Sequence, residues 1–480
     1  MLKFVSRPRE TPEKRPAAAR AGDFAEIYAR FSAARASAQS ARCSQCGVPF
    51  CQTHCPLGND IPDWLRLVAE GRLEEAYAVS SATNNMPEVC GRICPQDRLC
   101  EGACVIEQSG HGTVTIGAVE QYITETAFAN GWVKPVTPAA ERPESVGIVG
   151  AGPAGLAAAE ELRKEGFQVT VYDRYDRAGG LLLYGIPNFK LDKAVVERRV
   201  RRLEESGVRF VLSFEVGRDA SLADLRVSHD AVLIAIGVYK ARELACPGAG
   251  DDGVVAALDY LTASNRKGLG DVVPAFDDGR LDAAGKDVVV IGGGDTAMDC
   301  VRTAVRQGAR SVRCLYRRDR ANMPGSQREV THAEEEGVVF EWLAGPKAVL
   351  GDAGRASGLK AARMRLGPAD ASGRQAPQEI QGGAFDLPAD LVIKALGFDP
   401  ENVHTLFGEP RLALTRRGTL RVDPATLETN IDGVFAAGDI VRGASLVVWA
   451  IRDARLAASA IAARLASQTE TRNLRVMAAE

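Results

Sequence analysis

The most informative chemistry in this sequence is a run of cysteines near the N-terminus, where eight of the 11 lie between Cys43 and Cys104. Iron–sulfur clusters are held by cysteine thiolates, and a [4Fe–4S] cluster takes four ligands. Proline directly follows Cys55 and Cys94, as it does at the end of bacterial ferredoxin runs. The pattern therefore predicts two [4Fe–4S] clusters, and the candidate ligands are Cys43, Cys46, Cys51, Cys55, Cys90, Cys94, Cys100 and Cys104.

Zinc, disulfides and inert thiols are the alternatives for these cysteines. Structural zinc sites usually pair two closely spaced hooks, and here only Cys43 and Cys46 have the two-residue spacing. Disulfides are rare in a reducing cytoplasm, where we expect this chain. Inert buried thiols account for two or three cysteines but not for eight so close together.

A glycine-rich turn follows the apolar run 145–149, in the order Gly150-x-Gly152-x-x-Gly155. The first glycine permits a tight turn, the second lets the backbone approach a pyrophosphate, and the third lets the next helix pack closely. Asp173 ends the next apolar run, where an acidic side chain accepts hydrogen bonds from a ribose. The pattern predicts a dinucleotide site, with a purely structural turn as the alternative.

Three other segments resemble those of the flavin disulfide reductases and indicate FAD at this first site. Gly180 lies in a Gly-Gly pair where such folds bring their backbone close to the flavin. Gly237 ends a small-residue turn like the one that closes their flavin domain. Gly438 and Asp439 end a segment similar to their second FAD signature, in which the aspartate binds the ribityl chain. The resemblance implies a flavin domain made from two separate stretches of chain.

A second glycine turn follows the apolar run before Gly292, continuing through Gly294 to Ala297. Alanine at the third position still allows close helix packing. The next apolar run ends in Arg317 and Arg318 rather than in an acid. Arginine accommodates a ribose 2′-phosphate, so the sequence predicts NADPH rather than NADH, with a solvated arginine pair as the alternative.

The predicted flavin site lacks a cysteine pair that could act as a redox disulfide. We therefore expect electrons to leave the flavin through the iron–sulfur clusters. FAD takes a hydride in one step and releases electrons singly, as one-electron clusters require. No side chain need act as a general acid or base, so we assign no catalytic residue.

These sites need two kinds of scaffold. Up to about residue 135 the chain reads as mostly helical, with apolar residues at 3–4 spacing in 23–31 and 63–68. Beyond it, short Val- and Ile-rich runs alternate with helical stretches, as in parallel sheets covered by helices. The predicted strands are 145–149, 168–172, 231–236, 287–291, 311–316, 390–395 and 432–436.

The fold class expected is α/β, with two Rossmann-like dinucleotide-binding domains preceded by a mostly helical iron–sulfur domain. The boundaries expected are residues 1–140 for the iron–sulfur domain, 141–285 and 395–480 for the FAD-binding domain, and 286–394 for the NADPH-binding domain.

Bulk composition excludes several function classes. Lys and Arg number 59 against 62 Asp and Glu, which gives no support to nucleic-acid binding. No apolar run reaches the roughly 18 residues that span a bilayer, and the N-terminus has no secretory apolar stretch. We therefore expect no membrane role and a cytoplasmic location.

With both nucleotide sites and the cysteines in view, the chain resembles the small (beta) subunits of bacterial glutamate synthase over nearly its whole length. The matching signatures are residues 42–51, 90–95, 292–300 and 322–325. The resemblance implies that NADPH reduces FAD and that electrons pass through two [4Fe–4S] clusters to a large (alpha) subunit. That partner makes glutamate from glutamine and 2-oxoglutarate, for which this chain has no region of its own.

The resemblance also implies how the ligands divide. On the family pattern Cys43, Cys46, Cys51 and Cys104 hold one cluster, and Cys55, Cys94 and Cys100 hold most of the other. The fourth ligand of the second cluster is Cys90 or Glu120, between which spacing does not choose. Another acceptor, such as ferredoxin or a pyrimidine reductase, and a non-catalytic redox-sensing assembly module are the alternative functions.

Overall fold

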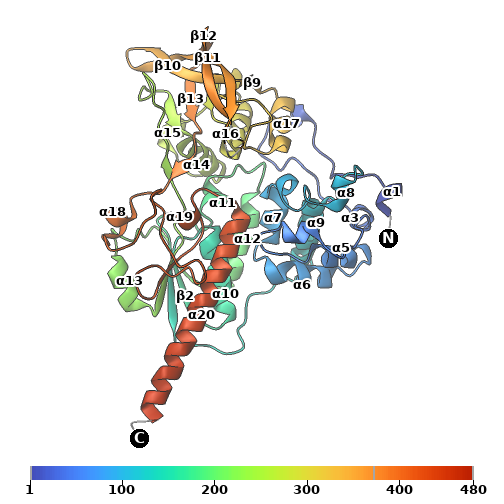
Figure 1. The fold of residues 1–480 in the computed structure, drawn as a ribbon, viewed down its shortest axis with the longest axis vertical. Coiled ribbons are helices and arrows are strands. Elements are labelled where there is room, and N and C mark those ends of the chain that lie inside the picture. Colours follow the sequence, from blue (N-terminus) through green and yellow to red (C-terminus); the bar gives the residue numbers. More distant parts are fainter. Residues whose placement is uncertain (1–2, 371–372, 374, 478–480) are drawn as a thin grey trace.

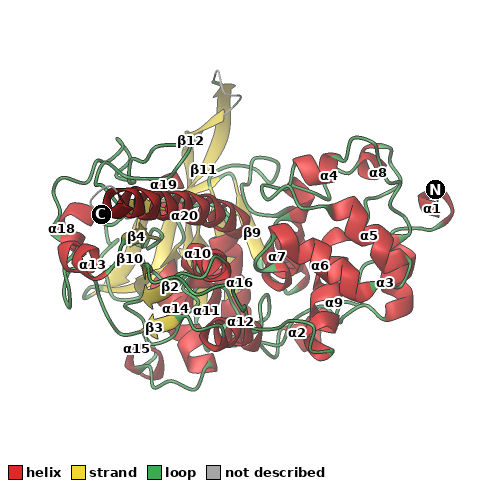
Figure 2. Ribbon diagram, turned by 90° about the horizontal axis from the view of Figure 1, so that it is seen from below, coloured by secondary structure: helices red, strands yellow, loops and turns green. Residues whose placement is uncertain are grey.

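The computed structural model describes residues 3–370, 373 and 375–477, with side chains to residue 469. Figure 1 shows a helical module, coloured blue, beside two α/β units that lie one above the other. Figure 2 shows that this module consists of helices and loops and stands to one side of both sheets. The predicted α/β class with a preceding helical module is confirmed.

Short helices packed around a small apolar core form the N-terminal module. They are α1 (Lys3–Ser6), α2 (Ala17–Arg20), α3 (Ala33–Ser40), α4 (Phe50–Thr53), α5 (Ile61–Ala69), α6 (Leu73–Thr83), α7 (Pro87–Ile93), the 3-10 turn η1 (Gln96–Arg98), α8 (Val105–Gln108) and α9 (Ile116–Ala129). Trp64 of α5 is almost fully buried in that core. The helix α9 contacts α3, α5, α6 and α7, so it organises the loops that carry the cysteines. The helix predicted over 63–68 is confirmed as α5.

Residues 23–31, which their apolar spacing predicts to be helical, form an extended segment instead. The backbone N–H of Arg15 donates to Ile27 O at 3.0 Å, so the segment pairs with the chain just before it. The Tyr28 hydroxyl lies 2.8 Å from His332 Nε2, in the upper α/β unit. The helix prediction was wrong because these tertiary contacts outweigh a weak local preference.

The lower α/β unit is built on a five-stranded parallel sheet. Its strands run in the order β15 (Val434–Ala436), β4 (Ala231–Ile234), β1 (Ser145–Val149), β2 (Gln168–Tyr172) and β3 (Arg209–Val211). Strand β15 comes from the C-terminal part of the chain and pairs with β4, so the predicted discontinuous unit is confirmed. The helices of this unit are α10 (Pro153–Lys164), α11 (Leu181–Tyr184), α12 (Lys193–Glu205), α13 (Leu222–Ser228), α18 (Val403–Phe407), α19 (Asp439–Arg442) and α20 (Val447–Met477).

The upper unit repeats this plan with a second five-stranded parallel sheet. Its strands run in the order β6 (Val254–Ala256), β13 (Leu391–Lys394), β7 (Asp287–Ile291), β8 (Ser311–Tyr316) and β9 (Val339–Trp342). Residues 288–291 are buried and apolar, as expected for strands covered on both faces. The helices are α14 (Ala257–Gly268), α15 (Pro274–Asp277), α16 (Asp295–Arg306) and α17 (Gln327–Glu335).

An antiparallel sheet of β10 (Ala344–Asp352), β11 (Arg355–Ala369) and β12 (Gln375–Pro388) extends from the upper unit (Figure 1). The sequence did not predict it. Its strands carry many polar, Gly and Pro residues, and one face is largely exposed, so they lack the long apolar runs of buried parallel strands.

The chain passes between the two units twice, and the two crossings are joined. Strand β5 (Lys240–Ala241) pairs antiparallel with β14 (Phe398–Asp399), and the Arg242 guanidinium donates to Asp399 at 2.8 Å. Gly397 has φ +93°, a conformation that glycine adopts without strain. This pairing fixes the strand ends of the lower unit opposite the upper unit.

The last described element is α20, which packs along α10 beside the lower sheet. Among the described residues, no helix combines the length and apolar character needed to cross a membrane.

Candidate functional site

The three positions of the first turn are occupied by glycine for different steric reasons. A Cβ added at Gly150 would lie 2.5 Å from Ala235 O, and one at Gly155 would overlap the carbonyl oxygen of Gly150. A Cβ at Gly152 would meet no protein atom within 4 Å, although this residue lines a cavity. Gly150 and Gly155 are therefore required by the fold, whereas Gly152 leaves room for a group that approaches the backbone closely.

Asp173, at the end of β2, ties that strand to the glycine turn. Its carboxylate accepts hydrogen bonds from the backbone N–H of Ala151 at 2.6 Å and of Tyr175 at 2.8 Å. Burial raises the pKa of this carboxyl group. A carboxylate has about four lone-pair positions, so it can still accept from ribose hydroxyls. Gly180, with φ +53°, lies against the turn, since a Cβ there would be 2.8 Å from Gly152 Cα.

The C-terminal segment brings Gly438 and Asp439 to the same place. The backbone N–H of Ala437 donates to Ile234 O at 3.0 Å, which fixes this segment beside β4. Gly438 has φ +79°. Burial raises the pKa of Asp439 to about 6. Helix α20 begins at Val447, and its N-terminal end lines the same cavity.

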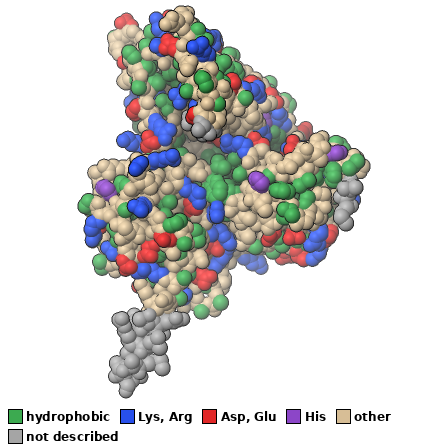
Figure 3. Space-filling view, in the orientation of Figure 1, with side chains coloured by type: hydrophobic (Ala, Val, Ile, Leu, Met, Phe, Trp, Pro, Cys, Tyr) green, Lys and Arg blue, Asp and Glu red, His purple; other side chains and the backbone are tan. Residues whose placement is uncertain are grey.

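One cavity collects most of the residues predicted to bind flavin. Figure 3 shows a hollow where the three parts of the molecule meet, with hydrophobic side chains at its floor. Gly155, Gly180 and Gly438 do not line the cavity and instead support its wall. The predicted residues that line it are Gly150, Gly152, Asp173, Gly237 and Asp439.

The second glycine turn faces this cavity from the upper unit. A Cβ at Gly292 would overlap the carbonyl oxygen of Ala395, whereas one at Gly294 would meet no protein atom within 4 Å. Ala297 is fully buried. Asp295, which follows Gly294, begins α16 and lines the same cavity, which we call the shared cavity. The end of a helix that favours anions therefore points toward the flavin-side wall.

Arg317 and Arg318 lie at the end of β8, away from the shared cavity. Arg317 is exposed and has no ion-pair partner within the described part of the chain. Arg318 is half-buried, and its Nε donates to Gln375 O at 3.1 Å. Both cations thus follow β8, which pairs with β7, the strand that leads into the second glycine turn.

The first cysteine group forms around Cys51. Burial, followed by the nearby charges of Cys104 and Cys43, raises the pKa of this thiol to about 12. The charge of Cys46 adds to the same effect at Cys43 and Cys51. Gln45 Nε2 donates to Cys43 Sγ at 3.3 Å. The fold therefore brings together the four cysteines that the resemblance assigns to one cluster.

The second group is more deeply buried and lies on the cavity side of the module. Burial is the main cause that raises the pKa of Cys94 and Cys100, followed by neighbouring acidic groups that include Glu120 and Cys55. Burial raises the pKa of Glu120 to about 8. Cys55, Cys94, Cys100 and Glu120 therefore lie close to one another, as ligands of one cluster must.

Cys90 and Glu120, the alternatives for the fourth ligand, share a neighbour. Asn84 Nδ2 donates to Glu120 Oε1 at 3.1 Å, and Asn84 Oδ1 lies 3.8 Å from Cys90 Sγ. Within the described residues, no three His, Cys, Asp or Glu side chains form a single-ion site. Cluster ligands each bind a different iron and need not converge as zinc ligands do.

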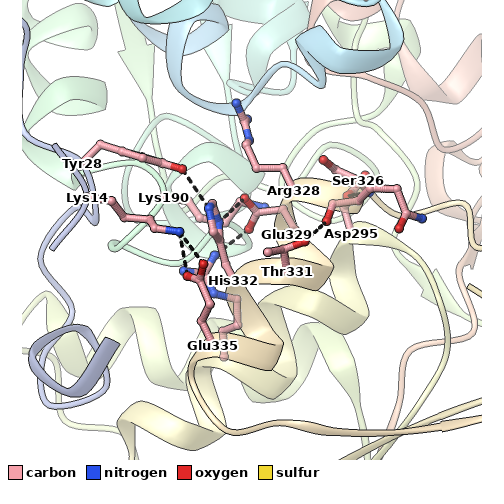
Figure 4. A network of polar contacts seen from close by, with 12 residues as sticks. Lys14, Tyr28, Lys190, Asp295, Ser326, Arg328, Glu329, Thr331, His332 and Glu335 are labelled. Atoms are coloured by element: carbon pink, nitrogen blue, oxygen red, sulfur yellow. Dashed lines mark hydrogen bonds and ion pairs between the residues drawn. The ribbon is translucent and has the colours of Figure 1, made fainter. Parts of the chain in front are cut away.

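Three cations on the cavity wall were missed by the sequence reasoning, namely Arg92, Lys190 and Arg328. Lys190 comes from the lower unit and pairs with Asp299 of α16 at 2.8 Å. Figure 4 shows Lys190 beside Glu329 and His332 of α17. Only Arg92 carried a local signal, because it lies inside the Cys90–Cys94 signature; the others approach the site through tertiary folding alone.

Comparison with known proteins agrees with this arrangement. A family model described as dihydropyrimidine dehydrogenase domain II, 4Fe-4S cluster, matches residues 20–132, and one described as pyridine nucleotide-disulphide oxidoreductase matches residues 144–454. The glutamate synthase (NADPH) small chain of Azospirillum brasilense is 67% identical over 470 residues, covering 98% of this chain and 97% of that protein. The small chain of the same name from Escherichia coli K12 is 44% identical, covering 96% and 98%.

Among solved structures, FprA from Mycobacterium tuberculosis in complex with NADPH superimposes with a TM-score of 0.58 at 21% identity, covering 69% of this chain and 86% of that one. This likeness supports the α/β fold of the upper unit and of the lower unit. The chain is an NADPH-dependent oxidoreductase with an N-terminal iron–sulfur module, and it belongs to the family of glutamate synthase (NADPH) small chains.

Proposed function

We propose that this chain oxidises NADPH in the cytoplasm and delivers the electrons to the large (alpha) subunit of glutamate synthase, for glutamate formation from glutamine and 2-oxoglutarate. FAD and two [4Fe–4S] clusters are the proposed carriers, and when bound they convert a hydride into single electrons. The observation that carries the proposal is the shared cavity. It is lined by Gly152 of the first turn, Asp295 of the second, and Ile93 and Pro95, which flank Cys94.

Each wall of that cavity has a separate role in the proposal. The turn around Gly152 and the Asp173 carboxylate would hold the pyrophosphate and ribose of FAD, while Asp439 and the N-terminal end of α20 would hold its other end. The turn around Gly294 would hold NADPH. The apolar lining, which includes Leu182 and Val447, excludes water from the place where the hydride moves.

Substitution of the two arginines that follow β8 tests whether they give the chain its preference for NADPH over NADH. We expect the double variant Arg317→Ala, Arg318→Ala to raise the KM for NADPH by at least about tenfold, since even one charge-assisted hydrogen bond to phosphate contributes about 1.5–3 kcal/mol. The KM for NADH should change little. Steady-state kinetics with an artificial electron acceptor measures both constants.

Arg320→Ala is the matched control, because Arg320 also follows β8 but pairs with Glu334 at 2.8 Å. It should leave the preference for NADPH unchanged. Equal loss of NADPH and NADH affinity in the double variant would contradict the assigned role.

The first cysteine group supports an exit for electrons at the surface of the module. Cys43, Cys46 and Cys51 are partly exposed, whereas the cavity-side Cys94 and Cys100 are buried. Three exposed apolar side chains accompany the first group: Val48 and Phe50 lie between Cys46 and Cys51, and Val105 follows Cys104. Figure 3 shows hydrophobic side chains gathered on this module. We propose that the large subunit docks over these residues.

The docking proposal predicts that Phe50→Glu weakens binding of the large subunit by about 2 kcal/mol, or roughly thirtyfold, because a charge replaces an apolar anchor. NADPH should still reduce the flavin. Affinity for the purified large subunit, measured by biolayer interferometry under argon, gives the result. Val227→Glu is the control, since Val227 is an apolar side chain that is even more exposed, on α13 of the lower unit. Equal weakening by both variants would contradict docking at this surface.

An anaerobic titration tests the proposed function as a whole. Purified protein with intact clusters is titrated with NADPH and separately with NADH, while flavin absorbance, iron and sulfide are measured. Bleaching at low NADPH with about eight irons per chain is expected from two [4Fe–4S] clusters. The absence of bleaching with either nucleotide would refute the dehydrogenase role and favour an assembly module.

A further inference from the structure

Arg328 occupies the point where the upper α/β unit meets the iron–sulfur module. It lies in the first turn of α17 and lines both the shared cavity and an adjoining cavity beneath the N-terminal segment. Its Nη1 donates to Gln96 Oε1 at 3.3 Å, and Gln96 follows Cys94 by two positions. In Figure 4 its side chain points away from the Lys14–Glu335 pair, toward the ribbon of the module.

The charge of Arg328 is not neutralised by a direct ion pair within the described residues, unlike those of its neighbours. Lys190, which lines the same two cavities, pairs with Asp299 at 2.8 Å. Arg98 crosses the same interface and lies 3.6 Å from Asp295. The Nε of Arg328 is buried without a hydrogen-bond partner. Its positive charge therefore remains available to other groups nearby.

That charge reaches the second cysteine group. Arg328 lines the shared cavity together with Ile93 and Pro95, the two residues that flank Cys94. The buried Glu101, which follows Cys100, lines the adjoining cavity with Arg328 and already pairs with Arg9 at 3.0 Å. Arg328 is thus an electrostatic neighbour of a predicted cluster ligand, although it belongs to the nucleotide-binding unit.

We propose that Arg328, which belongs to the NADPH-binding unit, raises the reduction potential of the cavity-side cluster held by Cys55, Cys94 and Cys100. The inference rests on the ligand set proposed above. Reduction adds one electron, and hence one negative charge, to a cluster. A fixed cation nearby stabilises the reduced form, most strongly where water is excluded. Arg328 itself neither gains nor loses a proton or an electron.

The test is a potentiometric titration of the complete holoprotein, with each cluster followed by electron paramagnetic resonance. In Arg328→Gln, we expect the ratio of reduced to oxidised cavity-side cluster to fall about tenfold at a fixed potential, which corresponds to about 59 mV for a one-electron couple. The cluster of Cys43, Cys46, Cys51 and Cys104 should keep its potential.

Two further variants separate charge from structure. Arg328→Lys keeps the charge but loses the guanidinium contact to Gln96, so its potential should stay close to that of the wild type. Arg98→Gln removes another interface arginine whose charge is already paired with Asp295, and it should change neither cluster. If Arg328→Gln does not retain iron, Arg328→Lys decides the question, because a purely structural role predicts a lowered potential there.

The outcomes distinguish this inference from the proposed function. An unchanged potential in Arg328→Gln with full iron content would overturn the inference and leave the function standing. Equal shifts of both clusters, or the same shift in Arg98→Gln, would also overturn it, because they indicate general loosening of the interface. About four irons per wild-type chain would instead overturn the two-cluster assignment on which it rests.

Discussion

Gly152→Val is expected to give a folded protein that binds almost no FAD. The Cβ at this position meets no protein atom within 4 Å, so the chain accommodates a side chain there without internal overlap. The same space lies over the turn where the backbone must approach a pyrophosphate. We expect flavin content, measured by absorbance after denaturation, to fall below roughly a tenth of the wild-type value.

Two controls make this prediction specific. The thermal midpoint of Gly152→Val should match that of wild-type protein stripped of FAD, because a ligand stabilises only the state that binds it. Gly294→Val should retain flavin, which dithionite still bleaches but NADPH does not. Gly155→Val differs from both, since its side chain would overlap the Gly150 carbonyl and should prevent folding. Wild-type flavin content in Gly152→Val would refute the role given to this turn.

The parallel strands were the most predictable part of the fold. The strands predicted over 145–149, 168–172, 287–291 and 311–316 have the same bounds in the structure, and those over 231–236, 390–395 and 432–436 contain shorter strands. Buried parallel strands are apolar on both faces, so their sequence shows them directly. The β10–β12 sheet has one exposed face and escaped this criterion.

The cavity was less predictable than the turns that form it. Glycine spacing indicates where the backbone must turn, because the steric reason is local, as at Gly150. The arrival of Lys190 and Arg328 depends on how the units pack, and nothing in the neighbouring sequence indicates it. The extended course of residues 23–31 has the same origin, since Tyr28 contacts a helix far along the chain.

Cysteine spacing predicted the number of thiolates but did not divide them. The proposed division agrees with the fold, in which Cys104 lies near Cys51, while Cys94 lies between two residues of the cavity wall, Ile93 and Pro95. Electrons that leave the flavin would therefore meet the second group first. The order has a direct experimental consequence.

Cys94→Ser is expected to uncouple NADPH oxidation from glutamate synthesis. Loss of this thiolate removes a ligand of the cavity-side cluster, so iron should fall from about eight to about four per chain. NADPH should still bleach the flavin, because Cys94 takes no part in either glycine turn. Glutamate formation by the complex with the large subunit should fall at least about a hundredfold, since even changes behind a metal ligand cost 10- to 100-fold.

The matched control is Cys246→Ser, which makes the same substitution at a cysteine outside both groups. It should keep its iron and its glutamate synthesis. Cys43→Ser should also stop synthesis, but by removing the outer cluster, so the cavity-side cluster should still be reduced by NADPH. Reduction of the outer cluster at the wild-type rate in Cys94→Ser would contradict the proposed order. Electrons would then have a path from the flavin that avoids the residues lining its cavity.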